Sequence, residues 1–263
     1  MSEARTVRAT VEYDGAGFHG FQRQRGARTV QGELESAILA AAGAKVTVAG
    51  AGRTDSGVHA LGQVIACRIG TQLDDATLLR AVNAHLPSDV AIRQLTTATK
   101  EFDPRRDATA RIYEYWIEQR PVRPVLDRSR AWHIAQPLDI AQMRCAAAQL
   151  VGTHDFDAFT AGPQDGTQRE VFALEVWREG TAVYIRIAAN AFLYRMVRRV
   201  VAVLVRVGRG EIDAASVASL LRPAPRAEVR GTAPAHGLTL MRVEYSGAER
   251  RYNRERTKQA VMR

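Results

Sequence analysis

The stretch VRATVEYDG, residues 7–15, decides how the first half of this sequence folds. Its apolar residues alternate with polar ones at Val7, Ala9, Val11 and Tyr13, which is the period of a strand that buries one face. The Asp-Gly pair at its end favours a turn. We therefore expect a half-buried strand here, followed by a turn and then a helix.

The segments that follow complete one unit of strands and helices. Over residues 29–43, Leu34, Ile38 and Leu39 fall near helical spacing and Gly43 is a stop signal, so a helix is expected. The remaining patterns predict strands at 45–50, 62–70 and 89–97 and a helix at 74–87. The resulting order, β-α-β-β-α-β, is that of a ferredoxin-like unit.

The same order starts again after residue 105. The patterns predict strands at 110–119, 170–179, 182–189 and 238–245, and helices at 139–152, 193–204 and 213–222. The second of these helices carries one apolar stripe, formed by Leu193, Met196, Val197, Val200, Val201 and Leu204. We therefore predict an α+β protein of two tandem ferredoxin-like units, residues 1–105 and 106–246, with a central cleft.

The charge of the chain points to a class of partner. There are 37 Lys and Arg residues against 28 Asp and Glu, a net charge of +9. Most of the excess is arginine, which grips phosphate and stacks on bases, so nucleic acid is the leading partner class, with a solvated basic surface as the alternative. The segment 247–263 has six basic and two acidic residues and no apolar periodicity, so we expect a basic, disordered tail.

Several other classes of protein are disfavoured. Cys67 and Cys145 are the only cysteines and stand far apart, which argues against a disulfide framework or a structural zinc site. The six histidines form no HxxxH or HxE pair, so no metal site is expected. Ser56 lacks the G-x-S-x-G setting of a serine nucleophile. No leader segment and no apolar run of membrane-spanning length is present, so we expect a cytoplasmic protein.

A second stretch, AGRTDSGVHA at residues 51–60, places Asp55 between Arg53 and Gly57. A carboxylate in a site that binds an anion should repel that anion, so the presence of an acidic residue here has to be explained. The glycines fit no phosphate loop, because Asp55 stands where a dinucleotide fingerprint has its third glycine and Val58 where a Walker loop has lysine. A turn aspartate that binds local backbone and a catalytic aspartate remain the two interpretations.

Residues 51–60 resemble the active-site loop of the tRNA pseudouridine synthase A (TruA) family, which reads very nearly AGRTDxGVHA. The resemblance covers nearly the whole chain. It is carried, in order, by EYDGAGFHGFQRQ, TVQGELE, VNAHLPSDVAI, FDPRRDATARIYEY, HDFDAF, NAFLYRMVRRVV and GTAPAHGLTLMRVEY. Ordered matches at the family's spacing are more specific than one loop, so they favour the catalytic interpretation of Asp55.

The resemblance implies a pseudouridine synthase fold and an isomerase that converts uridine to pseudouridine at positions 38, 39 and 40 in the anticodon stem and loop of tRNA. It also implies a homodimer that binds one tRNA across both subunits. Asp55 is the implied nucleophile, since an ionised carboxylate can attack C1′ of the sugar or add to C6 of the ring. Both routes remain open, and neither needs a cofactor or a metal.

Further site residues are implied by position. Arg53 would pair with Asp55 and keep it ionised, and Arg198 would pair with the same carboxylate from the border of its helix's apolar stripe. Tyr113 matches the active-site tyrosine, with Tyr115, which faces the same side, as the competing assignment. The residues implied to bind substrate are Tyr113, Arg23, His59, Arg195 and Arg199, with a structural role as the alternative for His59.

The sequence departs from the family at two positions. Phe21 stands where the family usually has Trp, and Ala202 where it has Gly. Neither touches the carboxylate, so the departures bear on substrate details more than on activity. The alternative function is a non-catalytic module that binds structured RNA on the same fold, and such a module would have no use for Asp55 in a phosphate channel.

Overall fold

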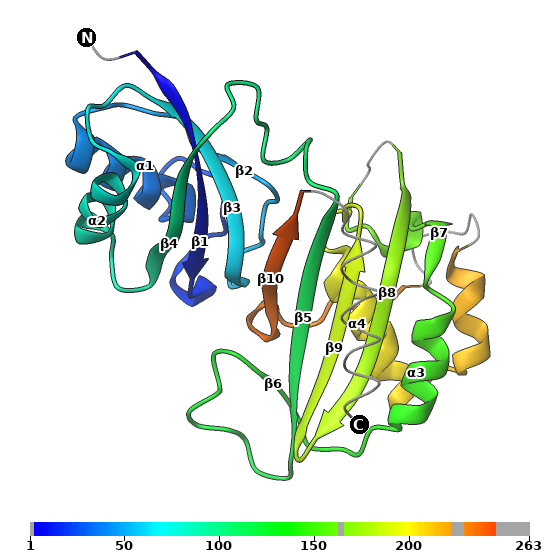
Figure 1. Ribbon diagram of the computed structural model, residues 1–263. Helices are drawn as coiled ribbons and strands as arrows, with labels where there is room; N and C mark the ends of the chain where they lie inside the picture. Colours follow the sequence, from blue (N-terminus) through cyan, green and yellow to red (C-terminus); the bar gives the residue numbers. More distant parts are fainter. Residues whose placement is uncertain (1–2, 163–165, 222–228, 246–263) are drawn as a thin grey trace, which may run out of the picture. The chain divides into compact units, whose positions relative to one another are not determined.

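The computed structural model of the chain describes residues 3–162, 166–221 and 229–245, which Figure 1 draws in colour. The chain forms two compact units, one made of Met1–Ala108 with Leu240–Tyr245 and one built on Thr109–Thr239. The predicted tail at 247–263 lies outside the described residues. The architecture is mixed α+β, as the sequence predicts.

The first unit contains a sheet with the strand order β4-β1-β3-β10. Its elements are β1 (Arg5–Tyr13), η1 (Gly15–Gly17), α1 (Val30–Ala42), β2 (Ala49–Gly50), β3 (His59–Ile69), α2 (Asp75–His85), β4 (Val90–Ala98) and β10 (Leu238–Glu244). β1 is antiparallel to both of its neighbours, with Val7 opposite Cys67 in β3 and Thr97 in β4. α1 and α2 pack against each other beside this sheet (Figure 1).

The periodic patterns of the first unit are confirmed. Val7, Ala9, Val11 and Tyr13 of β1 are all buried, with at most 4% of each exposed. Thr29 caps the start of α1, where its side chain accepts a hydrogen bond from the N–H of Gly32, and Gly43, with a φ of 64°, caps its end. The order from β1 to β4 is β-α-β-β-α-β, as expected.

The predicted strand at 45–50 is wrong over most of its length, since only Ala49–Gly50 pairs as β2. The N–H of Val48 donates to Oε1 of Glu35 in α1 at 3.0 Å and so has no role in a strand ladder. A side chain of the preceding helix therefore takes the place of a neighbouring strand.

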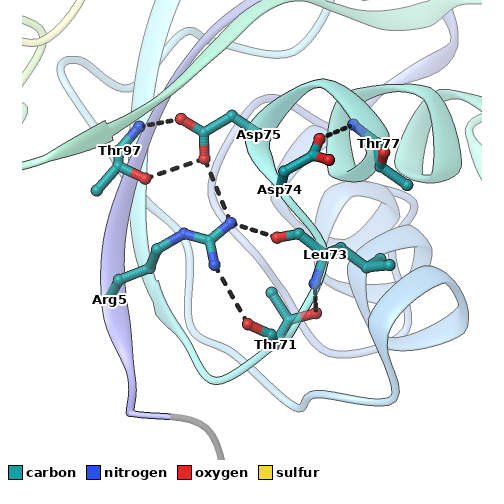
Figure 2. A network of polar contacts seen from close by, with 7 residues as sticks. All are labelled: Arg5, Thr71, Leu73, Asp74, Asp75, Thr77 and Thr97. Atoms are coloured by element: carbon teal, nitrogen blue, oxygen red, sulfur yellow. Dashed lines mark hydrogen bonds and ion pairs between the residues drawn. The ribbon is translucent and has the colours of Figure 1, made fainter.

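A network of polar contacts joins β1, α2 and β4, as Figure 2 shows. The guanidinium of Arg5 donates to the carbonyls of Thr71 and Leu73, at 3.2 and 2.6 Å, and to the carboxylate of Asp75 at 3.2 Å. Asp75 also accepts from the N–H and the hydroxyl of Thr97, at 2.7 and 2.9 Å. Burial of this carboxyl raises its pKa, but the hydrogen bonds from Thr97 and Arg5 outweigh burial, and the pKa is lowered overall.

We expect Asp75→Asn to destabilise the first unit by about 1–2 kcal/mol, because an amide cannot accept all three hydrogen bonds. Since the folded-state pKa of Asp75 is lowered, its contribution is present above the unfolded pKa of about 4 and is lost as the pH falls through the folded pKa. Thermal melts at pH 7 and pH 3 check this. The difference in melting temperature between wild type and variant should be smaller at pH 3 than at pH 7. The control Glu101→Gln, which changes an exposed acidic residue, should melt like wild type at both pH values. An equal difference in melting temperature between wild type and Asp75→Asn at both pH values would contradict the prediction.

The second unit contains a sheet with the strand order β5-β9-β8-β7, and β6 pairs with β5 in parallel. Its elements are β5 (Ala110–Gln119), β6 (Trp132–Ile134), α3 (Ile140–Ala148), β7 (Gly152–Asp155), η2 (Asp157–Phe159), β8 (Gln168–Glu179), β9 (Ala182–Ala189), α4 (Met196–Gly208), η3 (Ala214–Leu221) and η5 (Ala235–Gly237). α3 and α4 pack together, and α3 packs on β8 (Figure 1). The stripe of α4 is buried as predicted, from Met196 to Leu204.

Three features of this half differ from the sequence patterns. The short strands β6 and β7 have no expected counterpart, and the predicted helix at 213–222 is the 3-10 helix η3. The predicted last strand of the second half, β10, is grouped from Leu240 onward with the first unit. The Tyr245 hydroxyl there donates to the Pro104 carbonyl at 2.8 Å, and the Arg8 guanidinium lies 4.3 Å from the Tyr245 ring centroid. These contacts, distant in sequence, attach the end of the strand to the first unit.

Candidate active site

The loop that carries Asp55 connects β2 to β3 in the first unit. Asp55 is half-buried, and its carbonyl accepts a hydrogen bond from the N–H of Val58 at 3.1 Å, which closes a turn. Gly57, the third residue of this turn, has a φ of 80°, a value that a residue with a side chain rarely adopts. The turn therefore spans residues 55–58, and it fixes the backbone that follows the carboxylate.

Thr54, directly before Asp55, is held by the core of the first unit. Its hydroxyl lies 2.8 Å from the hydroxyl of Tyr13 in β1, and its carbonyl accepts from the N–H of Phe21 at 3.1 Å. Gln63 of β3 donates to the carbonyl of Gly52 at 2.8 Å. Burial raises the pKa of Tyr13 to about 12, so its hydroxyl stays protonated near neutral pH and can serve the loop as a donor.

Two glycines let the segment after β1 approach the loop backbone. A Cβ added at Gly15 would lie 2.0 Å from the carbonyl oxygen of Val58, and one at Gly20 would lie 2.8 Å from the carbonyl oxygen of Thr54. Ser56 donates from its hydroxyl to the carbonyl of Phe18 at 3.0 Å. The loop is thus packed against residues 15–20, and a small residue is required at each closest approach.

His59 begins β3, with 2% of its surface exposed. Its Nδ1 lies 3.0 Å from the backbone nitrogen of Gly15 and 3.0 Å from Oδ1 of Asp14. With a lone pair on Nδ1 the ring accepts from Gly15, and with a proton there it pairs with Asp14. In either form Nδ1 of His59 faces the turn after β1, which favours the structural alternative given above for this residue.

The two predicted arginines of the first unit have different surroundings. Arg53 is exposed. Arg23 donates to Oε2 of the buried Glu35 at 2.8 Å while 65% of its own side chain stays exposed. Phe21, one of the departures from the family pattern, is buried against Gly50, where an added Cβ would lie 2.6 Å from the ring. Phe21 thus contributes packing close to the loop.

Tyr113 and Tyr115 both lie on β5 in the second unit and point to the same face. The Tyr115 hydroxyl donates to the Pro234 carbonyl at 2.8 Å, and its ring packs so closely on Gly237 that a Cβ there would lie 2.5 Å from it. Burial raises the pKa of Tyr115 strongly. Tyr113 is 7% exposed and makes an edge contact with the ring of Phe192, at 5.2 Å between centroids. The two tyrosines therefore have different surroundings, which the sequence did not distinguish.

The three predicted arginines of the second unit lie at the start of α4, where Arg195 is the N-cap and Arg198 and Arg199 belong to the first turn. Nε of Arg198 donates to the carbonyl of Ala233 at 2.7 Å. Arg199 donates to the carbonyls of Ala158 and Thr160, at 3.0 and 2.7 Å, so its guanidinium braces the segment around η2. Arg195 is exposed, and its φ of 58° is the only positive value among the non-glycine residues that the structure describes.

The predicted site residues thus fall into two groups. Asp55, Arg53, Arg23 and His59 belong to the first unit, and Tyr113, Arg195, Arg198 and Arg199 to the second. That these groups meet in a central cleft stays a prediction. Sequence reasoning did not single out Tyr13, Gln63, Gly15 or Gly20 as supports of the loop. The signal for the two glycines was the density of glycine in EYDGAGFHG.

Among the described residues, no group of His, Cys, Asp and Glu side chains is arranged to hold a metal ion. In the same ranges no helix has the length and apolar content needed to cross a bilayer. An α+β fold with a half-buried carboxylate on a turn held by its neighbours, two residues from the exposed Arg53, fits an enzyme that acts on a polyanion such as RNA.

Comparisons with known proteins name the family. A family model described as tRNA pseudouridine synthase matches residues 9–105 and 146–246. A tRNA pseudouridine synthase A of Anaplasma marginale (strain Florida) is 41% identical over 244 residues, covering 90% of this chain and 99% of the relative. One of Thermoanaerobacter sp. (strain X514) is 40% identical over 243 residues, covering 92% and 100%. The chain belongs to the tRNA pseudouridine synthase family, and it is an isomerase.

One solved structure resembles this chain weakly. A Cbf5-Nop10-Gar1 complex aligns with a TM-score of 0.35 at 10% identity, covering 76% of this chain and 44% of that chain. A TM-score of this size carries no argument. The membership of the family therefore depends on the sequence matches, which support the catalytic interpretation and give no support to a non-catalytic RNA-binding module.

Proposed function

We propose that this enzyme works in the cytoplasm and isomerises uridine to pseudouridine at positions 38, 39 and 40 of the anticodon stem and loop of tRNAs, with Asp55 as its nucleophile. One observation carries the proposal: the turn that presents Asp55 is fixed on both sides by Thr54, Gly52 and Ser56. A carboxylate that only completed a turn would not require its neighbours to be hydrogen-bonded to β1, β3 and residues 15–20. Catalysis does need a reacting group held in position.

The reaction breaks the bond between N1 and C1′, turns the uracil and joins C5 to C1′, and the hydrogen on C5 is finally exchanged for one on N1. No electrons are gained or lost overall. Asp55 can form a temporary ester at C1′ or add to C6 of the ring, and either bond is broken again when the product forms. The chemistry therefore requires one ionised carboxylate and a group that moves a proton.

The other site residues are assigned supporting roles. Arg53 and Arg198 are proposed to keep Asp55 ionised beside the RNA, and Tyr113 to stack on the uracil after it leaves the helix. Arg23, His59, Arg195 and Arg199 are proposed to bind substrate. For His59 and Arg199 this role would be indirect, because each is engaged with backbone groups of its own unit.

The test is a map of pseudouridine in the tRNA of a strain that lacks this gene. We expect the modification to be missing at positions 38, 39 and 40 and unchanged at other positions. It should return with the wild-type gene and not with a gene that encodes Asp55→Asn. A map that is unchanged on deletion, or a loss at other positions, would reject the assignment.

Variants of the two tyrosines should separate catalysis from stability. We expect Tyr113→Phe to lower turnover by about 10- to 100-fold, because it removes a hydroxyl that we propose moves a proton in the reaction. Tyr115→Phe should cost about 1–3 kcal/mol of stability, because it leaves the Pro234 carbonyl without its donor, and turnover should be kept. Single-turnover assays and thermal melts on both variants check this. The reverse pattern would assign the catalytic role to Tyr115.

We also propose a homodimer that binds one tRNA across both subunits. Two chains with a net charge of +9 each would offer a long surface for phosphates, so tRNA affinity should fall steeply with salt. Light scattering at micromolar concentration should give about twice the chain mass of 28.9 kDa. A monomeric mass with full activity would contradict this prediction.

A further inference from the structure

The sheet of the second unit carries a row of three aromatic rings that the proposed function does not use. Trp116 of β5 stands opposite Tyr184 of β9, which stands opposite Trp177 of β8. The rings stack, with centroids 6.1 Å apart for the first pair and 5.2 Å for the second. Strand alternation places them on the opposite face from the buried Tyr115 and Ile185. All three are half-buried.

Acidic residues border this row on both sides. On one side Glu114 and Glu175 stand opposite Arg186, and on the other Glu118 and Glu179 stand opposite Ala182. These strand positions thus hold four carboxylates and one guanidinium, in a chain whose net charge is +9. We call the three aromatic residues with these flanking residues the acid-aromatic face. Burial, and then the charges of Glu179, Glu114 and Glu118, raise the pKa of the Tyr184 hydroxyl, in keeping with a negative potential there.

Arg186 shows how this face binds an arginine. Its Nε and Nη2 donate to Oε2 of Glu114, at 3.0 and 2.7 Å, and its guanidinium carbon lies 5.0 Å from the Trp177 ring centroid. The guanidinium therefore has an ion pair and a cation–π contact at once. At the equivalent position on the other side of the row stands the buried Ala182, so no cation occupies the strand position between Glu118 and Glu179.

Two further contacts indicate which groups of the face are still available. Glu118 is paired with Arg120 at 3.7 Å and accepts a hydrogen bond from the Thr181 hydroxyl at 2.7 Å. Glu179 is exposed and its Oε1 accepts from Nε1 of Trp177 at 2.9 Å, but no cation among the described residues pairs with it. Nε1 of Trp116 is buried and donates no hydrogen bond to any residue that the structure describes. A buried donor of this kind normally has an acceptor. The face therefore offers the exposed carboxylate of Glu179 to a guanidinium and the Trp116 donor to a carbonyl, which together fit an arginine-bearing peptide.

The chain itself has such a peptide. Residues 246–263, SGAERRYNRERTKQAVMR, hold six basic and two acidic side chains. The chain leaves the second unit at Thr239, so residue 246 starts within about 25 Å of that unit, and an extended segment of this length spans about 60 Å. A unit of this size has a radius of gyration of about 14 Å, so every face of it is within reach. Tethering also raises the effective concentration of the segment to about the millimolar range.

We propose that the acid-aromatic face binds the chain's own C-terminal segment, residues 246–263, through its arginines. An RNA strand fits the face less well, because four carboxylates would repel its phosphates. The proposal is independent of the tRNA reaction, since none of the residues in the face is assigned to the active site.

The test uses the chain ended at Tyr245 and a synthetic peptide of residues 246–263 added to it. Two of the protein's three tryptophans lie in the face and the peptide has none, so tryptophan fluorescence reports binding. We expect a saturable change that weakens as salt is raised. In the paired variant Glu175→Gln with Glu179→Gln, binding should weaken by about five- to tenfold. The matched control, Glu101→Gln with Glu211→Gln, removes the same charge elsewhere and should bind like the parent.

Four outcomes would overturn the proposal. The first is no saturable change at millimolar peptide, and the second is equal affinity for the paired variant and its control. The third is equal affinity for a scrambled peptide of the same composition, which would make the face a general site for basic segments. The fourth is displacement of the peptide by a short oligouridylate whose own binding strengthens in the paired variant, which would make the face an RNA surface. Circular dichroism melts confirm that each variant is folded.

Discussion

Asp55→Asn is expected to abolish pseudouridine formation in an anticodon stem-loop, to within detection. The amide keeps the size of the side chain and one hydrogen-bonding oxygen, but it has no negative charge and is a far weaker nucleophile. Affinity for tRNA should stay equal or rise, because one charge that repels phosphate has gone. The melting temperature should change little, because the hydrogen bonds of the Asp55 carbonyl and of Thr54, Gly52 and Ser56 are kept in the variant.

Single-turnover assays, tRNA binding and thermal melts on the same preparation separate the two roles of Asp55. A turn aspartate without a catalytic role predicts the reverse of the result above, with activity kept and a lower melting temperature. Ser56→Ala is the matched control. It alters the neighbouring residue and removes one hydrogen bond to the Phe18 carbonyl, so turnover should stay within about tenfold of wild type.

Gly15→Ala is expected to have the second largest effect, although residue 15 contributes no side chain to the chemistry. Its Cβ would lie 2.0 Å from the carbonyl oxygen of Val58, which is backbone and cannot rotate away. The loop or the turn after β1 must shift, at a cost of about 1–3 kcal/mol of stability. A displacement of about 1 Å at the carboxylate would lower turnover by about 100-fold.

The control for this prediction is Gly162→Ala, where no atom of the described residues, its chain neighbours aside, lies within 4 Å of the added Cβ. It should leave turnover and the melting temperature unchanged. Assays below the melting temperature of each variant show whether Gly15→Ala reduces turnover in the folded protein. Wild-type turnover and an unchanged melt for Gly15→Ala would show that the loop tolerates the shift and that its position is not critical.

Much of the fold follows from local patterns. The alternation of Val7, Ala9, Val11 and Tyr13 predicts β1 and its buried face, and helical spacing with Gly43 predicts α1 and its end. These features depend on residues close together in sequence, whose side-chain directions are set by the period of the element. The patterns were less useful for β2, because the buried carboxylate of Glu35 binds Val48 from a different element.

For the site, the sequence determined the family and predicted the reacting group. The stretch 51–60, with its ordered companions along the chain, was enough to single out Asp55 and to predict an isomerase of tRNA, and family membership is confirmed. A motif of this kind is read from the residues alone, because the chemistry requires a particular side chain whatever surrounds it.

Only the tertiary structure decided what holds and surrounds these residues. Tyr115 has its hydroxyl on the Pro234 carbonyl, whereas the Tyr113 ring lies against Phe192. β10 joins the first unit from Leu240 onward, and Tyr13 and Gln63 hold the flanks of the loop. The acid-aromatic face likewise needs the register of β5, β9 and β8. Each of these contacts joins residues that are distant in the chain, and their pairing depends on how whole elements pack, which the local sequence does not encode.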